Sequence, residues 1–339
     1  GQLGADPGIS LPKPSLPVRL ALLVAGTTLP LIIFAAGLVY NHYQQDRRQA
    51  TQRVLETVRS IRLVLDAEMQ RMTGALQVLA LTDVLRDRNF DEFRRLSQGF
   101  LNQYGNGGVI LVADREGRQL FSSVTSDTAS LPPRNNRAIV DRVFAEKKPV
   151  YSNLFFGAVK HQLIVTVEVP VIRDGEVLFE LSFSPPIQIF QTMIEQQRPG
   201  NDWTISIFDG EGSNFARVPN PQDTIGQKAS PTLYAAMFRA PEATFATVSL
   251  EGVPLITSVS RSTLTGWTVA AGIAESSLVA PLWRSLAVTS VMGGILLLVG
   301  LAFAVRMATQ IARGEMLHGL LIEELNHRVK NTLAVLQSI

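Results

Sequence analysis

The stretches VILVADREGRQLFSS, at residues 109–123, and TISIFDGEGSNFARV, at residues 204–218, repeat one pattern within the chain. Each contains an apolar run, an aspartate, a glycine-containing turn and a second run that returns toward apolar residues. Because Asp and Gly favour tight turns and positive φ, each stretch is predicted to form a β-hairpin. A repeat of this length within one chain indicates two copies of one structural unit.

The similarity between the two copies continues after the hairpins. A loop with Pro and Asn and a short predicted helix follow each hairpin, and the segments 163–184 and 253–274 then have the composition of closing strands. We therefore predict two tandem α+β modules, at 104–200 and 201–282.

A long helix is predicted before the first module. Residues 42–103 are rich in Arg, Gln, Glu and Leu and contain no proline, and apolar residues such as Val54 and Val58 recur at helical spacing. We expect this amphipathic helix to carry the modules, with a break near Gly74 or Asp83.

Two segments are long and apolar enough to cross a membrane. Residues 20–40 and 286–305 contain no charged side chain, and about 20 helical residues span a bilayer. A cleaved signal peptide is the alternative for the first segment, but its apolar run exceeds a typical signal sequence and no clear small-residue cleavage site follows. Basic residues flank both ends of both segments, so charge does not decide the orientation.

The predicted fold class is an α+β membrane protein with both termini on one side and the modules on the other. Its parts, in order, are a flexible cytoplasmic leader (1–17), a first transmembrane helix (18–41), a helical spine (42–103), a membrane-distal module (104–200), a membrane-proximal module (201–282), a second transmembrane helix (283–306) and a cytoplasmic signalling helix (307–339).

Composition excludes several classes of function. The chain of 339 residues has 46% hydrophobic and 18% charged residues, and its net charge of +2 gives no strong field for nucleic acid. The absence of cysteine excludes disulfides, cysteine-ligated metals and thiol nucleophiles. The four histidines are far apart in the sequence, so no metal site and no cofactor site is expected within the chain.

The last residues, EELNHRVKNTLAVLQSI at 323–339, form an amphipathic helical pattern around one histidine. His327 faces away from the apolar seam, beside the carboxylates of Glu323 and Glu324, and is chemically suited to accept a phosphoryl group whose charge Lys330 would help to balance. From spacing alone, an ordinary solvated histidine is the alternative. The seam itself predicts a helical dimer, and it consists of Ile322, Leu325, Val329, Thr332, Leu336 and Ile339.

The segment LNHRVKNTLAVLQSI, at 325–339, closely resembles the phosphoacceptor box of HWE-type and related sensor histidine kinases. The resemblance implies that His327 is autophosphorylated, with Arg328, Lys330 and Asn331 completing the motif. It also implies ATP as phosphoryl donor, bound by a domain that these 339 residues do not include, a response regulator as acceptor, and a homodimer.

Residues 41–280 resemble the double Cache domain, in which a long helix carries two PAS-like sheets outside the membrane, and GWTVAAGI at 266–273 is similar to its last strand. This resemblance implies a bacterial inner-membrane protein with periplasmic modules, cytoplasmic termini and a small-molecule ligand in the membrane-distal module. The residues 104–186 contain no Trp, which argues against an amino-acid ligand of the kind that one double Cache subgroup binds through a Tyr/Arg/Trp cluster.

Basic and aromatic residues cluster in the predicted membrane-distal module. Such residues favour an organic anion, because an arginine fork matches a carboxylate; the alternative is that they are ordinary surface residues. The predicted ligand-binding residues are Arg134, Arg137, Tyr151, Phe155, Phe156, Lys160 and His161.

The sequence thus predicts a sensor histidine kinase that responds to an extracytoplasmic small molecule. A non-catalytic Cache-type transmembrane receptor, similar to a chemoreceptor or an adaptor, is the alternative.

Overall fold

The computed structural model of the protein describes residues 16–104, 106–127, 131–219 and 222–337. The chain divides into two compact units, one at Asp46–Leu278 and one made of the segments up to Gln45 and from Val279. The predicted leader, 1–17, lies outside the described residues except for its last two positions, where the first helix begins.

The N-terminal helix α1 is 65 residues long, from Leu16 to Ala80. It continues through Gly74, so the predicted break at that position is wrong. Met72 and Leu76, on either side of Gly74, are fully buried, and this packing outweighs the weak helix propensity of one glycine. The chain leaves the helix only after Ala80, close to the alternative break at Asp83. Two shorter helices follow, α2 (Asp83–Arg86) and α3 (Phe90–Tyr104).

The first sheet, which belongs to the distal module, has five strands in the order β2-β1-β7-β6-β3. Helix α4 (Arg137–Glu146) lies against β6 and β7, and a separate hairpin pairs β4 with β5. The strands are β1 (Val109–Ala113), β2 (Gln119–Ser122), β3 (Val150–Tyr151), β4 (Phe155–Gly157), β5 (Gln162–Ile164), β6 (Val167–Arg173) and β7 (Glu176–Ser184).

The second sheet, in the proximal module, repeats this plan with the order β10-β11-β12-β8-β9. The predicted hairpins at 109–123 and 204–218 are both confirmed, as β1–β2 and β8–β9. Helix α5 (Gln188–Gln196) falls within the predicted bounds of the first module but packs against β8 and β9 of the second. The remaining elements of the second module are β8 (Trp203–Phe208), β9 (Asn214–Val218), α6 (Pro231–Met237), β10 (Glu242–Val248), β11 (Pro254–Arg261) and β12 (Thr268–Ala274).

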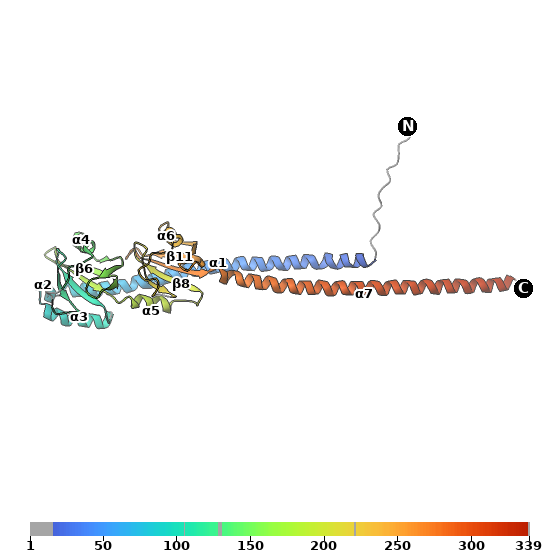
Figure 1. Ribbon diagram of the computed structural model, residues 1–339, viewed down its shortest axis with the longest axis horizontal. Helices are drawn as coiled ribbons and strands as arrows, with labels where there is room; N and C mark the ends of the chain where they lie inside the picture. The colour runs from blue at the N-terminus through green and yellow to red at the C-terminus, as the bar shows by residue number, and fades with distance from the viewer. Residues whose placement is uncertain (1–15, 105, 128–130, 220–221, 338–339) are drawn as a thin grey trace, which may run out of the picture. The chain divides into compact units, whose positions relative to one another are not determined.

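One hydrophobic core joins α1 to both sheets. The buried stripe of α1, which includes Val54, Val58 and Leu65, belongs to the same cluster as the inward side chains of both sheets. Figure 1 shows α1 running along the two sheets in turn. Trp203 and Trp267 are buried in this core. The α+β class with a long N-terminal helix and two sheets is therefore confirmed.

The second unit contains the N-terminal part of α1 and most of α7, which extends from Glu275 to Gln337. By length and composition, α1 and α7 each contain a segment able to cross a membrane. The two helices approach closely at small residues: a Cβ atom on Gly293 would lie 2.8 Å from Cγ1 of Ile32, and one on Gly300 would lie 2.8 Å from Cγ1 of Val24.

Candidate ligand-binding pocket

The outer face of the distal sheet, opposite the core, carries polar side chains. Alternate residues of a strand point to opposite faces, so Val167 and Leu181 fill the core while Glu168 and Glu180 point the other way. Leu111 on β1 pairs with Ser182 on β7, and Ser182 pairs with Glu168 on β6. The two glutamates therefore lie near one another on a surface that α4 and the preceding loop cover.

Arg134 brings one guanidinium group to both glutamates. Its Nη2 donates to Glu168 Oε1 at 2.7 Å and to Glu180 Oε1 at 2.9 Å. The three side chains are 3%, 0% and 0% exposed. The backbone N–H of Arg134 donates to the carbonyl oxygen of Gly117 at 2.9 Å, which fixes the loop on the first hairpin. Gly117 has a φ of +77°, a conformation that glycine adopts without strain.

The electrostatics of this cluster are set by burial and by the closeness of two carboxyl groups to one guanidinium group. Burial raises the pKa of Glu180 well above its usual range, and the neighbouring Glu168 carboxylate raises it further, while Arg134 acts in the opposite direction. When Glu180 is protonated, one negative carboxylate remains in the cluster, and its charge balances the positive charge of the Arg134 guanidinium. Arg134 thus carries no uncompensated charge, and the geometry gives no support to the expectation that it binds an organic anion.

A small cavity lies beside the cluster, between the sheet and the β4–β5 hairpin. Its volume is about 30 Å³, which is enough for about one water molecule. Gln119 and Thr166 line this cavity, and both residues are buried. Gln119 Oε1 and Thr166 Oγ1 have no hydrogen-bond partner among the described residues. Buried polar atoms without partners are uncommon in folded proteins, so a water molecule or a ligand that donates hydrogen bonds would satisfy these atoms.

The β4–β5 hairpin forms one side of the cavity, and it would have to shift for a ligand larger than a water molecule to enter. It contributes Phe155, Gly157, Lys160 and Ile164 to the lining, and it pairs only with itself. Because it shares no ladder with the five-stranded sheet, it can shift without breaking that sheet.

Three of the predicted ligand-binding residues line this pocket, namely Arg134, Phe155 and Lys160. Arg134 is nevertheless held by the two glutamates. The Lys160 amino group donates to the carbonyl oxygen of Gly107 at 2.5 Å.

The other predicted residues lie elsewhere. Arg137 is on the exposed side of α4, where it pairs with Asp141 at 3.1 Å. The Tyr151 hydroxyl is 3.0 Å from Thr73 Oγ1 on α1. Phe156 and His161 face each other across the hairpin, with ring centroids 6.3 Å apart.

Sequence reasoning missed Glu168, Glu180, Gln119 and Thr166. A usable signal was present: VEVPV and LFELSF each contain a single acidic residue in an otherwise apolar strand. Such an acidic residue is rarely tolerated in a covered strand unless it is paired.

The histidine box lies on α7. Arg328 Nε donates to Glu324 Oε1 at 3.0 Å, one helical turn apart, and Glu323 is exposed. The side chains of His327, Lys330 and Asn331 lie outside the part of the chain whose side chains are described.

No model of a known protein family matches the chain, and no curated protein matches it by sequence. The structure is similar to the periplasmic sensory domain of the Campylobacter jejuni chemoreceptor Tlp1, with a TM-score of 0.55 and 11% identity over 69% of this chain and 98% of that one. It is also similar to the extracellular domain of a proposed histidine kinase, with a TM-score of 0.53 and 12% identity over 70% of this chain and 97% of that one.

A third similar structure is an extracellular ligand binding receptor from Desulfohalobium retbaense, with a TM-score of 0.52 and 15% identity. The match covers 66% of this chain and only 40% of the receptor chain. The fold is therefore the Cache-like fold of extracellular sensor domains, which chemoreceptors and histidine kinases share.

Proposed function

We propose that the chain is the sensing and phosphoacceptor part of a membrane-bound sensor histidine kinase. The observation that carries this proposal is the course of α7: it begins at Glu275, directly after the last strand of the proximal sheet, and continues as one helix through an apolar segment into the HRVKN box. The sheet, an apolar segment long enough to span a membrane and the predicted phosphoacceptor motif are thus consecutive in one chain.

In the proposed protein, a bacterial inner membrane separates periplasmic modules from cytoplasmic termini. A small polar molecule enters the distal pocket and donates hydrogen bonds to Gln119 and Thr166. Binding must favour one of two arrangements of the sensor, because a ligand shifts an equilibrium only through its different affinities for the two states. The arrangement of α7 then controls phosphorylation.

The proposed chemistry is phosphoryl transfer. An imidazole nitrogen of His327 attacks the γ-phosphorus of ATP, the bond to the ADP oxygen breaks, and a carboxylate of Glu323 or Glu324 accepts the displaced proton. Arg328, Lys330 and Asn331 complete the motif around the phosphorylated histidine. The phosphoryl group then passes to an aspartate of a response regulator. ATP is bound by a kinase domain of the same protein.

A homodimer follows from the apolar seam of α7. Leu325 and Val329 are 60% and 54% exposed, and Ile322 lies on the same part of the helix with its side chain exposed. Aliphatic side chains at this spacing are typical of helices that pair with a second helix. A second copy of the chain would cover them.

Radiolabelled ATP tests the proposal on the full-length protein in membranes. We expect acid-labile label on the wild type and none on His327→Gln. The matched control is His318→Gln, which removes another histidine of α7, nine residues earlier in the same helix, and should keep the label. Label that persists in the His327 variant refutes the assignment.

The second proposal is a receptor with a purely conformational output, and the similarity to the chemoreceptor sensory domain favours it. Such a receptor carries no label on any histidine. It still changes the position of α7 when the ligand binds, which spin labels on this cysteine-free chain would detect.

A further inference from the structure

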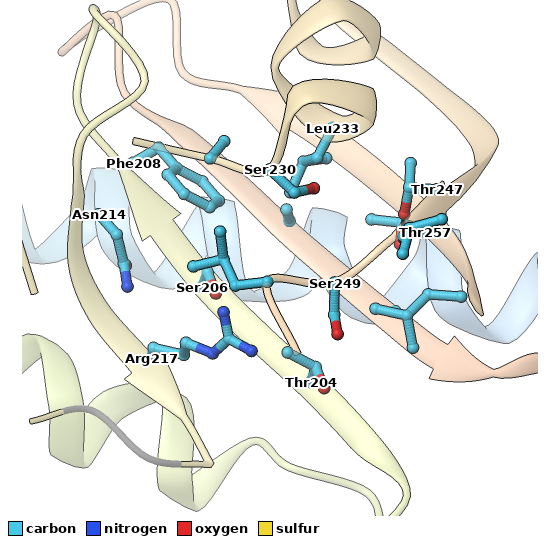
Figure 2. A pocket seen from close by; sticks show the side chains of 16 residues that line it. Thr204, Ser206, Phe208, Asn214, Arg217, Ser230, Leu233, Thr247, Ser249 and Thr257 are labelled. Atoms are coloured by element: carbon cyan, nitrogen blue, oxygen red, sulfur yellow. Dashed lines mark hydrogen bonds between the residues drawn. The ribbon is translucent and has the colours of Figure 1, made fainter. Parts of the chain in front are cut away.

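The proximal module has a second pocket at the position equivalent to the distal one. Ser206 and Asn214 occupy the places in the internal repeat that Leu111 and Gln119 occupy in the distal module, and all four line pockets. Figure 2 shows this second pocket, between the outer face of the sheet and α6. The duplication has therefore preserved a cavity in both modules.

The loops that close the two pockets are also equivalent. Arg134 donates its backbone N–H to Gly117 in the distal module, and Ala229 donates its own to Gly212 at 2.9 Å in the proximal module. Ala229 thus occupies the position in the proximal module that Arg134 occupies in the distal module. The residue at this position therefore brings no charge to the proximal pocket.

The two buried acids are also replaced. The sheet registers put Thr268 where the distal module has Glu180, and Val259 where it has Glu168. The sheet floor of the proximal pocket therefore carries no carboxylate.

A buried arginine enters the proximal pocket from a different element. Arg217 on β9 is 5% exposed, and Figure 2 shows its guanidinium pointing into the pocket toward Ser206. The backbone of Arg217 is fixed by Gln191, whose side chain accepts its N–H at 3.1 Å and donates to its carbonyl oxygen at 2.8 Å. The arginine is therefore held in place independently of any ligand.

Two polar atoms in this pocket lack a partner among the described residues, Arg217 Nε and Asn214 Oδ1. Both residues are more than nine-tenths buried. Asn214 uses its amide nitrogen on Thr224, at 3.0 Å to the hydroxyl, so its oxygen remains for a ligand. The free guanidinium donor can bind a carboxylate oxygen, whereas the free amide oxygen of Asn214 needs a hydrogen-bond donor, such as a hydroxyl group of the ligand or a water molecule.

The single carboxylate that contacts Arg217 comes from a turn. Arg217 Nη2 donates to both oxygens of Glu251, at 2.7 and 2.8 Å. Glu251 lies between β10 and β11, in a turn closed by a hydrogen bond from Ser249 N to Val253 O at 2.8 Å, and its side chain is 44% exposed. A half-exposed carboxylate can return to water at little cost, because its hydration replaces the lost ion pair.

Glu251 is ionised at neutral pH. Burial acts to raise its pKa, but a hydrogen bond with Ser249 and the charge of Arg217 together lower the pKa below its ordinary value. The turn thus presents a carboxylate to the buried arginine in the absence of ligand.

We propose that the proximal pocket binds a small aliphatic carboxylate through Arg217, and that this carboxylate displaces Glu251. The ligand carboxylate keeps the buried guanidinium neutralised after Glu251 leaves. Phe208, Leu233 and Ala270 supply an apolar wall for a short hydrocarbon chain. The closed cavity measures about 30 Å³, so the turn must open for the ligand to enter. This site adds a second input to the proposed sensor and does not depend on phosphorylation at His327.

Propionate binding to the solubilised chain, measured by calorimetry, tests the proposal, with propionamide and propylamine as neutral and cationic probes. We expect propionate alone to bind. Glu251→Gln removes the competing carboxylate, so its affinity for propionate should rise at least about tenfold. The matched control Glu211→Gln, an exposed acid of another turn in the same module, should leave the affinity unchanged.

Further variants locate the site. Arg217→Gln should abolish propionate binding, and Thr166→Val, at the distal pocket, should not change it. If Arg217→Gln fails to fold, the Glu251→Gln affinity decides alone. Three results would each overturn the proposal and leave the Arg217–Glu251 ion pair a purely structural contact. They are equal binding of propionamide and propionate, an unchanged propionate affinity in Glu251→Gln, and no propionate binding to the wild type or to Glu251→Gln.

Discussion

The indole Nε1 of Trp267 donates a hydrogen bond to the carbonyl oxygen of Ser152, with the two atoms 3.0 Å apart. Trp267 immediately precedes the last strand of the proximal sheet, and Ser152 follows β3 of the distal module. Next to it, Leu154 N–H donates to Asp209 Oδ2 at 2.9 Å. Hydrogen bonds as well as apolar packing therefore hold the two modules together.

Trp267→Phe tests this connection. The phenyl ring keeps most of the packing but leaves the Ser152 carbonyl oxygen buried without a donor, which costs about 1–3 kcal/mol. The free energy of unfolding of the solubilised chain in urea should fall by this amount. Trp283→Phe, the same substitution at an exposed position, is the control and should leave the unfolding midpoint unchanged. Equal effects of the two substitutions would contradict the role of the hydrogen bond.

Arg134→Gln is expected to destabilise the protein strongly. It leaves Glu168 and Glu180 facing each other in a buried site without a cation, and breaking a buried ion pair on one side costs about 3–5 kcal/mol. Arg137→Gln, three residues later on the exposed side of α4, should change stability by less than about 0.5 kcal/mol. Urea unfolding measures both. A small loss in the Arg134 variant would mean that the two acids lose their charge at little cost.

Glu180→Gln should change how stability depends on pH. Because the pKa of Glu180 is raised in the folded protein, the folded state binds more protons than the unfolded state above about pH 4.3. The contribution of this group is therefore fully present below the unfolded pKa and is lost as pH rises through the folded pKa. Glutamine keeps a hydrogen-bond donor and has no charge, so the variant should lose less stability than the wild type as the pH rises above about 4.3, the pKa of an unfolded glutamate.

Glu242→Gln is the control for this pH profile. Glu242 is paired with Arg59 at the surface, and a hydrogen bond from that arginine lowers its pKa. The contribution of Glu242 to the free energy of unfolding is present above the unfolded pKa and is lost as the pH falls. Glu242→Gln should therefore show the same loss of stability with rising pH as the wild type. Parallel pH profiles of the unfolding free energy for the wild type and Glu180→Gln would contradict a raised pKa of Glu180 in the folded protein.

The sequence was sufficient for the features that depend on local pattern. The two hairpins follow from Asp–Gly turns, and the spine follows from apolar residues such as Val54 and Val58 at helical spacing. The persistence of α1 through Gly74 could not be predicted in the same way, because it depends on tertiary burial of Met72 and Leu76 rather than on local propensity.

The pockets were harder to predict for a physical reason. Arg134 meets Glu168 and Glu180 because both glutamates point to the outer face of β6 and β7. Which residues point outward depends on the register of the two strands, and pairing with other strands fixes that register. The aromatic and basic residues predicted to bind the ligand therefore lie on different surfaces of the distal module. Arg217 and Glu251, 34 residues apart, meet only because β9 and the β10–β11 turn close over one sheet face.

The contact between α1 and α7 gives the last prediction. Gly300 and Gly293 bring α7 close to Val24 and Ile32, whereas a Cβ atom on Gly294 would meet no atom within 4 Å. Leucine at Gly293 should therefore force the helices apart, and leucine at Gly294 should not, because small residues at a contact allow two helices to approach closely. Because the chain has no cysteine, disulfide formation in a Val24→Cys/Gly300→Cys variant reports the approach without background. Cross-linking should fall severalfold when Gly293→Leu is added and stay unchanged with Gly294→Leu; the reverse order would show that a different face of α7 contacts α1.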